Sequence, residues 1–171
     1  MDNFYKDLYG MSESLNRLKK SQSYDVNKLV FSLKHLVGQL EYYYCDFLPK
    51  NQGDNYIHKE IALIENSLVY INLGRGFPKE IMDGHWCYVL KNYGYKLLVI
   101  PTTSVKADSM PINPKYEKDI QVMMNGKKAI SRMQLSDMRS VDAQRVYTRK
   151  NVCQVITSYE EICEFVKSNI F

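Results

Sequence analysis

The sequence predicts an α+β protein, in which a small antiparallel β-sheet is preceded by helices and followed by one more helix. Between residues 67 and 104, three short apolar runs alternate with polar residues. Gly, Pro, Asn and Asp interrupt them, which is the pattern of β-strands and hairpins. On either side of the sheet region, residues 3–47 and 158–170 place apolar side chains three and four positions apart, as amphipathic helices do.

The first 60 residues are predicted to form a helical extension. Apolar side chains define a helix over residues 3–19, and a break follows at residues 21–24. A longer helix starts at Asp25, and its apolar stripe consists of Val26, Leu29, Val30, Leu33, Val37, Leu40, Tyr44 and Phe47. A polar loop over residues 49–55 and a short helix over residues 56–66 lead into the sheet. We therefore divide the chain into a helical extension, residues 1–60, and a barrel domain with a C-terminal helix, residues 61–171.

Strands are predicted over residues 68–73, 86–90 and 96–101. The first connection, residues 74–84, is long and glycine-rich, and we expect a mobile loop over the face of the sheet. The second, residues 92–94, is short enough for a tight hairpin.

The second half of the sheet is predicted from its turns. Residues 119–132 form a hairpin around Asn125-Gly126, because both central residues of a type I′ turn need positive φ. Residues 105–116 contain two prolines and are predicted to be irregular, and residues 152–156 are predicted to form a closing strand. Ser158 and Glu161 have the spacing of a capping box, which predicts the start of the last helix.

Composition limits the class of protein without defining it. The 171 residues contain 23 Lys/Arg and 19 Asp/Glu, for a net charge of +4. Residues 1–60 hold 8 of each sign, so the remaining 15 and 11 give the whole excess to the strand-rich part. A mild excess of this kind permits a nucleic-acid partner but does not require one. No apolar run approaches the roughly 20 residues that span a bilayer, so no membrane partner is expected.

The four cysteines, Cys45, Cys87, Cys153 and Cys163, are widely separated, with no CxxC pair and no Cys/His ligand spacing. We predict reduced, mostly buried thiols in a cytoplasmic protein, with no metal site and no cofactor. No signal peptide is visible at the N-terminus.

Three motifs in order resemble the MazF/PemK family of toxin endoribonucleases. The first is Leu68-Val69-Tyr70-Ile71-Asn72-Leu73-Gly74, followed by Gly76, Glu80, Gly84 and the run from Cys87 to Leu90. The second, Pro101-Thr102-Thr103-Ser104, is similar to the strand-end threonine motif of the family. The third, Arg139-Ser140-Val141-Asp142-Ala143-Gln144-Arg145-Val146, is similar to the segment Arg-Thr-Val-Asp-Lys-x-Arg-Leu. Together the motifs extend over about half of the chain.

The resemblance implies an SH3-like, MazF-type antiparallel β-barrel over about residues 67–157, with N-terminal helices and a C-terminal helix added. It also implies a homodimer whose groove binds single-stranded RNA or an antitoxin protein. The implied reaction is metal-independent cleavage, in which a ribose 2′-hydroxyl attacks the adjacent phosphate.

One departure from the family concerns the start of the second strand. Family members have a catalytic Arg followed by Pro there, and an ungapped count places His85-Trp86 at that position. An imidazole changes charge near neutral pH and can act as acid or base. Because the catalytic arginine of the family is missing, the alternative function is a catalytically inactive barrel that acts as an RNA- or protein-binding regulatory module.

The resemblance makes His85, Thr103 and Arg139 the predicted catalytic residues. Thr103 would bond a phosphate oxygen, and Arg139 would offer paired guanidinium donors to it. The predicted RNA-binding residues supply charge, donors or an aromatic ring, and they are Arg75, Lys79, Glu80, Trp86, Thr102, Ser104, Arg132 and Gln134.

Three of these residues also have a purely structural interpretation. His85 has the position of a hydrogen-bonded histidine at a strand end. Arg139 has the spacing of a local ion pair with Asp142. Trp86 opens a strand, where a tryptophan belongs to the core more often than it stacks on a base.

Overall fold

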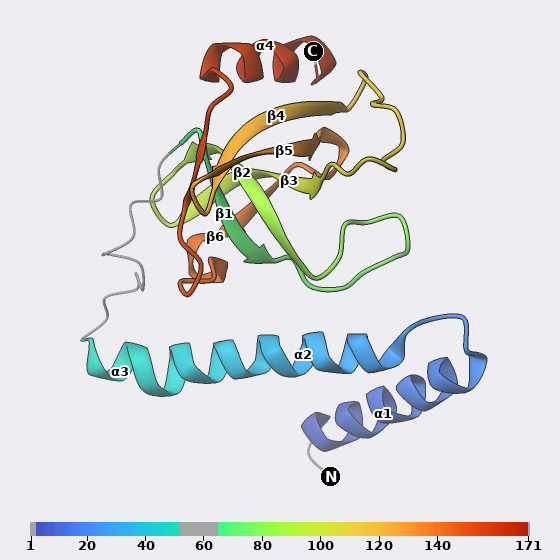
Figure 1. Cartoon of the computed structure of the whole chain (residues 1–171). Coiled ribbons are helices and arrows are strands. Elements are labelled where there is room, and N and C mark those ends of the chain that lie inside the picture. Colours follow the sequence, from blue (N-terminus) through green and yellow to red (C-terminus); the bar gives the residue numbers. More distant parts are fainter. Residues whose placement is uncertain (1–2, 52–64, 171) are drawn as a thin grey trace. The chain divides into compact units, whose positions relative to one another are not determined.

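The computed structural model describes residues 3–51 and 65–170, and the chain divides into two compact units, residues 1–52 and 53–171 (Figure 1). The predicted boundary between residues 60 and 61 and most of the short helix predicted over residues 56–66 lie outside the described residues. At Asn66 the backbone has a left-handed φ of 59°, so the predicted helix does not reach that residue.

The N-terminal unit is helical, as predicted. It contains α1 (Asn3–Ser21), α2 (Val26–Glu41), the π-helical turn η1 (Tyr42–Phe47) and α3 (Leu48–Lys50). The Asp25 side chain caps α2, since it accepts a 3.0 Å hydrogen bond from the backbone N–H of Lys28. The helix runs further than predicted, because Pro49 lies in the first turn of α3, where its missing N–H is tolerated.

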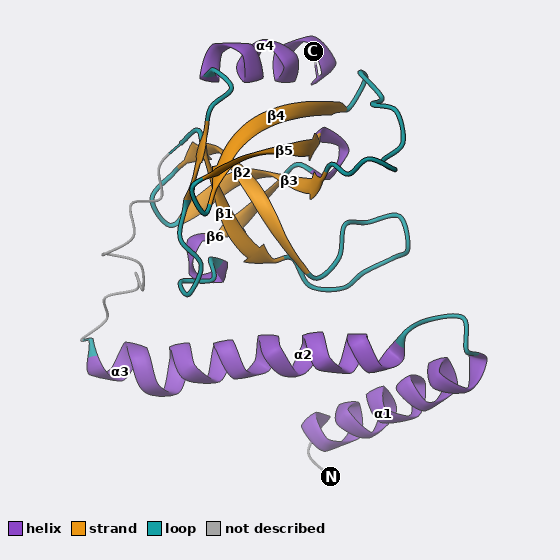
Figure 2. Ribbon diagram, in the orientation of Figure 1, coloured by secondary structure: helices purple, strands orange, loops and turns teal. Residues whose placement is uncertain are grey.

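The second unit is a closed, six-stranded antiparallel β-barrel (Figure 2). Its strands are β1 (Ser67–Asn72), β2 (Gly84–Asn92), β3 (Lys96–Ser104), β4 (Glu117–Met124), β5 (Lys127–Gln134) and β7 (Cys153–Val155). The ring order is β2-β1-β7-β4-β5-β3, and pairing of β3 with β2 closes it. A further strand, β6 (Arg139–Asp142), pairs with the first half of β3 and was not predicted.

The predicted turns are confirmed by backbone geometry. Asn125 and Gly126 have φ values of 50° and 74° and connect β4 to β5 in the predicted two-residue hairpin. Gly94 has a φ of 86° between β2 and β3. The β4–β5 register pairs Ile120 with Ser131 and Val122 with Ala129. These residues lie two positions apart on each strand, so their side chains lie on one face of the hairpin.

β1, β2 and β3 carry an apolar cluster on each of their two faces, because successive side chains of a strand point to opposite sides. One cluster fills the barrel and receives buried side chains from all six ring strands, among them Leu68, Tyr88, Ile100, Ile120, Met133 and Val155. The other lies on the opposite face of β1–β3, where β6 and the 3-10 turn η3 (Ala143–Arg145) cover Val69, Ile71, Val89 and Val99. Burying one such side chain contributes roughly 1.5–3 kcal/mol.

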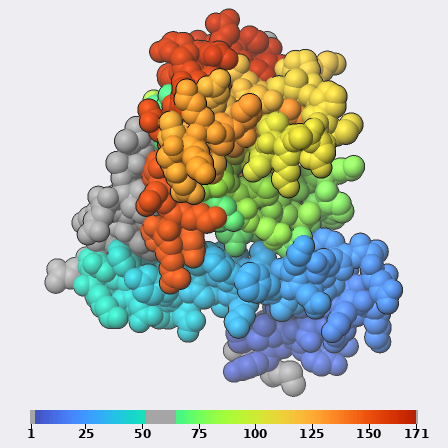
Figure 3. All heavy atoms as spheres, in the orientation of Figure 1, coloured from blue at the N-terminus to red at the C-terminus, as the bar shows by residue number. Residues whose placement is uncertain are grey.

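The C-terminal helix α4 (Tyr159–Ile170) covers one end of the barrel. Its Ile162 and Val166 join the interior cluster, and its Glu161 pairs with Lys118 at the start of β4 (2.6 Å). In the space-filling view, α4 in red lies against the orange β4–β5 hairpin (Figure 3). As predicted, the Ser158 hydroxyl accepts a hydrogen bond from the backbone N–H of Glu161 (3.2 Å), whereas the Glu161 carboxylate pairs with Lys118.

The opposite end of the barrel is called the open end here. It is the end at which β1, β3 and β4 finish and β2, β5 and β7 begin, because all pairings in the ring are antiparallel. His85, Thr103 and the Asn125–Gly126 turn all lie there. Within residues 3–51 and 65–170, no helix is long and apolar enough to cross a membrane.

Candidate functional site

The rim of the open end brings His85 and Thr103 together. Cys87 of β2 pairs with Pro101 of β3, and extending that register by two residues puts His85 opposite Thr103. On its other side His85 pairs with Ile71, and Thr103 pairs with Arg132 of β5. Because alternate residues of a strand face the same way, His85 and Thr103 lie on the outer face of the barrel wall. Both are partly exposed to solvent.

A hydrogen bond orients the imidazole of His85. Its Nδ1 lies 3.2 Å from the backbone carbonyl oxygen of Thr102. A carbonyl oxygen only accepts hydrogen bonds, so Nδ1 is the donor in this contact and carries the proton. In the neutral ring, Nε2 then has the lone pair and can accept a proton. This orientation allows the ring to serve as a base through Nε2.

The other residues of the Pro101–Ser104 motif have different surroundings. Thr102 is buried, and its Oγ1 donates a 3.0 Å hydrogen bond to the carbonyl oxygen of Trp86. Thr102 therefore joins β3 to β2 behind the rim. Ser104 is exposed at the end of β3, one residue beyond Thr103.

Arg139 pairs with Val99, four residues before Thr103 on β3, and is held by Asp137. Its Nη2 is 3.3 Å from Asp137 Oδ1, and its Nε donates to the Asp137 carbonyl oxygen at 3.2 Å. The predicted local ion pair with Asp142 is wrong, because the Asp142 carboxylate accepts from the backbone N–H of Gln144 and caps η3.

The positive charge of Arg139 acts on Cys87, which lies on the same face of β2 as His85. Burial raises the pKa of the Cys87 thiol to about 12, and the nearby Arg139 charge opposes that rise. Cys87 is two residues from His85, so both side chains lie on one face of the strand. Arg139 therefore adds a positive charge near Cys87, on the same face of the wall as His85.

The loop between β1 and β2 folds on itself. Leu73 and Asp83 are joined through a 2.8 Å backbone hydrogen bond, and Arg75 Nε lies 3.2 Å from Asp83 Oδ1. The Glu80 carboxylate accepts from the backbone N–H of Phe77 (3.2 Å) and so shapes the loop. Lys79 is exposed at the loop tip.

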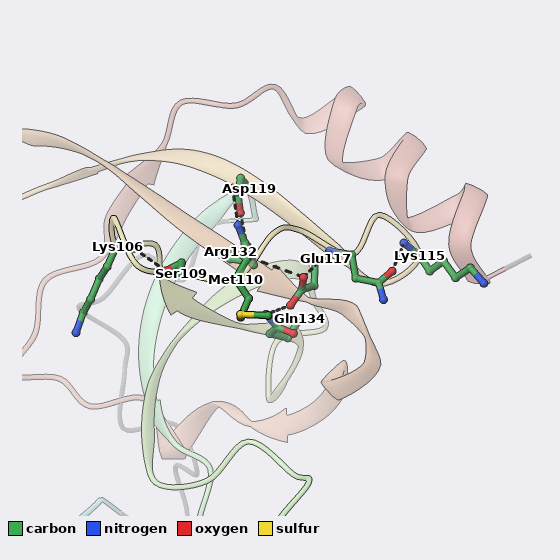
Figure 4. A network of polar contacts seen from close by, with 9 residues as sticks. Lys106, Ser109, Met110, Lys115, Glu117, Asp119, Arg132 and Gln134 are labelled. Carbon is green, nitrogen blue, oxygen red and sulfur yellow. Dashed lines mark hydrogen bonds and ion pairs between the residues drawn. The ribbon is translucent and has the colours of Figure 1, made fainter.

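Arg132 is the centre of a polar network on β4 and β5 (Figure 4). Nε and Nη2 donate to the two oxygens of Asp119 at 2.7 and 3.1 Å, and Nη1 donates to the carbonyl oxygen of Met110 at 2.6 Å. The residue is 9% exposed, and its bonds to Asp119 raise the pKa of the guanidinium. Gln134 joins the same network by donating to Glu117 at 3.0 Å. The donors of both predicted RNA-binding residues thus have protein partners.

Trp86 lies on the face of β2 opposite to His85. It packs against the interior cluster and meets the ring of Tyr70 edge-on, with 5.5 Å between ring centroids. The ammonium group of Lys150 lies 3.4 Å from the Tyr70 centroid and 5.6 Å from that of Trp86. Trp86 thus packs against the core, as the structural interpretation predicts, and the residue is also partly exposed to solvent.

Among the predicted residues, the structure brings His85, Thr103 and Ser104 together at one rim, with Arg132 opposite Thr103 on β5. Arg139 lies further along β3, opposite Val99. The structure separates Trp86 from the rim residues by the thickness of the wall. Sequence reasoning missed Asp137 and Lys150. The only sequence signal for Asp137 is an acidic residue two positions before the arginine of the third motif.

No protein-family model matches the chain, and no curated protein sequence matches it at a significant level. The resemblance described above therefore stays a prediction, and the class of protein that the structure defines is a six-stranded antiparallel β-barrel with added helices.

Proposed function

We propose that this protein is a toxin-type, metal-independent endoribonuclease that cleaves single-stranded RNA, and that its barrel is SH3-like, of the MazF/PemK type. The observation that carries the proposal is the position of His85. Its Nδ1 is bonded to Thr102 O, its Nε2 is available as an acceptor, and the register sets it beside the Thr103 hydroxyl.

The proposed reaction is an in-line displacement at phosphorus. Nε2 of His85 takes the proton of the ribose 2′-hydroxyl while O2′ forms a bond to the adjacent phosphorus. The bond from phosphorus to O5′ of the next nucleotide breaks, and O5′ takes up a proton from a water molecule. The products are a 2′,3′-cyclic phosphate and a 5′-hydroxyl end.

The extra negative charge on the phosphoryl oxygens needs donors and cations nearby. The Thr103 hydroxyl supplies a donor, and Arg139 supplies charge once its contact with Asp137 is exchanged for a phosphate oxygen. Arg132 has a structural part in this proposal, because its guanidinium already bonds Asp119 and Met110.

A second candidate function is a catalytically inactive barrel that binds RNA or protein. The engagement of Arg139 by Asp137 and of Arg132 by Asp119 favours it, since both arginines already have acceptors. The two functions differ in product: the first yields cut RNA, and the second yields only a complex.

The proposed partners are single-stranded RNA, a second copy of the chain and an antitoxin protein that blocks the rim. The proposed location is the cytoplasm, where antitoxin and substrate would meet the protein.

The test is a cleavage assay of the purified full chain on single-stranded RNA in excess chelator. His85→Ala should lower the rate at least a hundredfold, since general acid–base catalysis contributes about 10²–10⁴-fold. His35→Ala, in α2, is the matched control and should cut like the wild type. The same RNA with 2′-O-methyl groups should stay intact.

Equal cutting by His85→Ala and wild type would remove the assignment of His85. Bound but uncut RNA with the wild type would favour the binding module instead.

A further inference from the structure

The open end of the barrel contains a hollow of about 610 Å³. It lies between the β4–β5 turn, the segment that leads into β7, and the start of β2. Its lining includes Trp86, Met124, Asn125, Arg149, Lys150 and Gln154. Trp86, on the inner face of β2, forms part of its lining, whereas His85 lies on the outer face of the same strand.

We propose that this hollow binds one nucleotide of single-stranded RNA, with the base against Trp86 and Met124 and the phosphate on Arg149 and Lys150. The inference deepens the proposed function and rests on it for the identity of the polymer. The chemical class of the ligand, a nucleoside monophosphate unit, follows from the lining itself.

Charge is the first argument. Arg149 and Lys150 are exposed, and the lining contains no Asp or Glu. Within the described residues, no carboxylate forms an ion pair with either side chain. Lys127 and Lys128 follow directly after the turn that forms one wall. This concentration of positive charge attracts an anion and repels a cation.

The aromatic side chains are the second argument. Trp86 meets Tyr70 at an interplanar angle of 79°, and Tyr70 in turn meets Tyr147 at 65°. Lys150 lies over the Tyr70 ring, a cation–π contact that fixes its ammonium group at the edge of the hollow. A planar ring thus stands next to a positioned cation, as a base and its phosphate require.

The remaining lining suits a nucleobase better than an acidic peptide. Met123 and Met124 offer polarisable surfaces that adapt to a flat ring. Asn125, Asn151 and Gln154 offer both donors and acceptors, and a base edge can use both, whereas a carboxylate can use only the donors. Stacking on an aromatic side chain tolerates every base, so the hollow would bind nucleotides with modest selectivity.

Its place next to the rim gives the hollow a role in positioning. His85 and Trp86 are consecutive, and their side chains point to opposite sides of β2. An RNA strand with one base in the hollow must cross the rim to leave it. The nucleotide in the hollow would therefore decide which linkage lies beside His85 and Thr103.

Trp86 is the single tryptophan of the chain, so its fluorescence reports binding directly. Adenosine 5′-monophosphate should quench this emission in a saturable way. Inorganic phosphate tests charge alone, adenosine tests the base alone, and each should bind at least tenfold more weakly. Lys150→Gln and Arg149→Gln should each weaken the nucleotide at least fivefold, whereas Lys167→Gln, in α4 at the other end, should not.

The His85→Ala variant separates this inference from the proposed function, because it should lose cleavage and keep the quenching. A folded wild type whose emission does not respond to the nucleotide would overturn the inference, as would equal binding of phosphate alone. So would equal affinities of the Lys150→Gln and Lys167→Gln variants. Far-UV circular dichroism of each variant shows that it is folded.

Discussion

The Asp137 carboxylate accepts a 3.1 Å hydrogen bond from the backbone N–H of Ile81, a residue 56 positions earlier in the chain. The same oxygen, Oδ1, lies 3.3 Å from Nη2 of Arg139. One carboxylate therefore fixes the β1–β2 loop and Arg139 at the same time. The stability of the loop and the position of the arginine are coupled through it.

Replacing Asp137 should show this coupling. Asp137→Ala leaves the Ile81 N–H and the Arg139 guanidinium without their acceptor, and we expect a loss of about 1–3 kcal/mol in the free energy of unfolding. Urea denaturation measures it. Asp108→Ala, at an exposed position in the loop before β4, is the control and should change the midpoint little. Equal midpoints for the two variants would contradict the bridging role of Asp137.

Arg132 and Asp119 should contribute to the thermal stability as a coupled pair. Arg132→Met leaves the Asp119 carboxylate without its bidentate partner, so we expect a clear fall in thermal stability. The double variant Arg132→Met, Asp119→Leu removes both charges and should regain most of that loss. Thermal unfolding of the two single variants and the double variant gives the coupling. Additive losses would mean that the pair does not stabilise the β4–β5 hairpin.

The reactivity of the cysteine thiols should follow their exposure to solvent. Burial raises the pKa of Cys87 to about 12, and the residue is fully buried, so its thiol stays protonated and shielded at pH 8. Cys45 is exposed and should react with a thiol reagent within minutes, whereas Cys87 should react only after unfolding. A spectrophotometric thiol count with and without denaturant measures this.

The raised pKa of Cys87 also gives a pH dependence with a defined sign. The folded thiol keeps its proton up to about pH 12, while an unfolded thiol loses it near its ordinary pKa of 9.0. Stability from this group is therefore complete below pH 9 and is lost as pH rises toward 12. The Cys87→Ala variant should show a smaller loss of stability over that window.

Gly84 should tolerate no side chain. A Cβ at this position would collide with the hydroxyl end of Tyr70, whose ring is held by Trp86 and Tyr147. We expect Gly84→Ala to cost about 1–3 kcal/mol and to shift the emission of Trp86. Gly38→Ala, in α2 with open space around its Cα, is the control and should leave the emission unchanged. An unshifted emission in Gly84→Ala would show that Tyr70 relocates without moving Trp86.

The sequence predicts the local elements well and their long-range partners poorly. The turn at Asn125-Gly126 is predicted because positive φ at two successive residues has a specific chemical signature. The pairing of β6 with β3 has no such signature: Arg139–Asp142 is four residues long, and only contact with Lys96–Val99 makes it a strand. Tertiary context, not local propensity, decides such short segments.

The same reasoning applies to the candidate site. Alternation along β2 predicts that His85 and Trp86 face opposite sides, but not which side is the interior. The contact of Arg139 with Asp137 rather than Asp142 depends on where β6 begins, and no spacing rule contains that information. Lys150 reaches Tyr70 from a segment 80 positions away, as a consequence of barrel closure alone.

β7 lies between β1 and β4 in the ring and is the last of the six ring strands in chain order. β7 has three residues, pairs with β1 on one side and β4 on the other, and is followed directly by α4. A growing chain that stops before Cys153 has two unpaired strand edges and an interior cluster open to water. Residues 149–154 also line the hollow, so strands β1–β5 alone cannot form it, and it exists only after the segment leading into β7 has been synthesised.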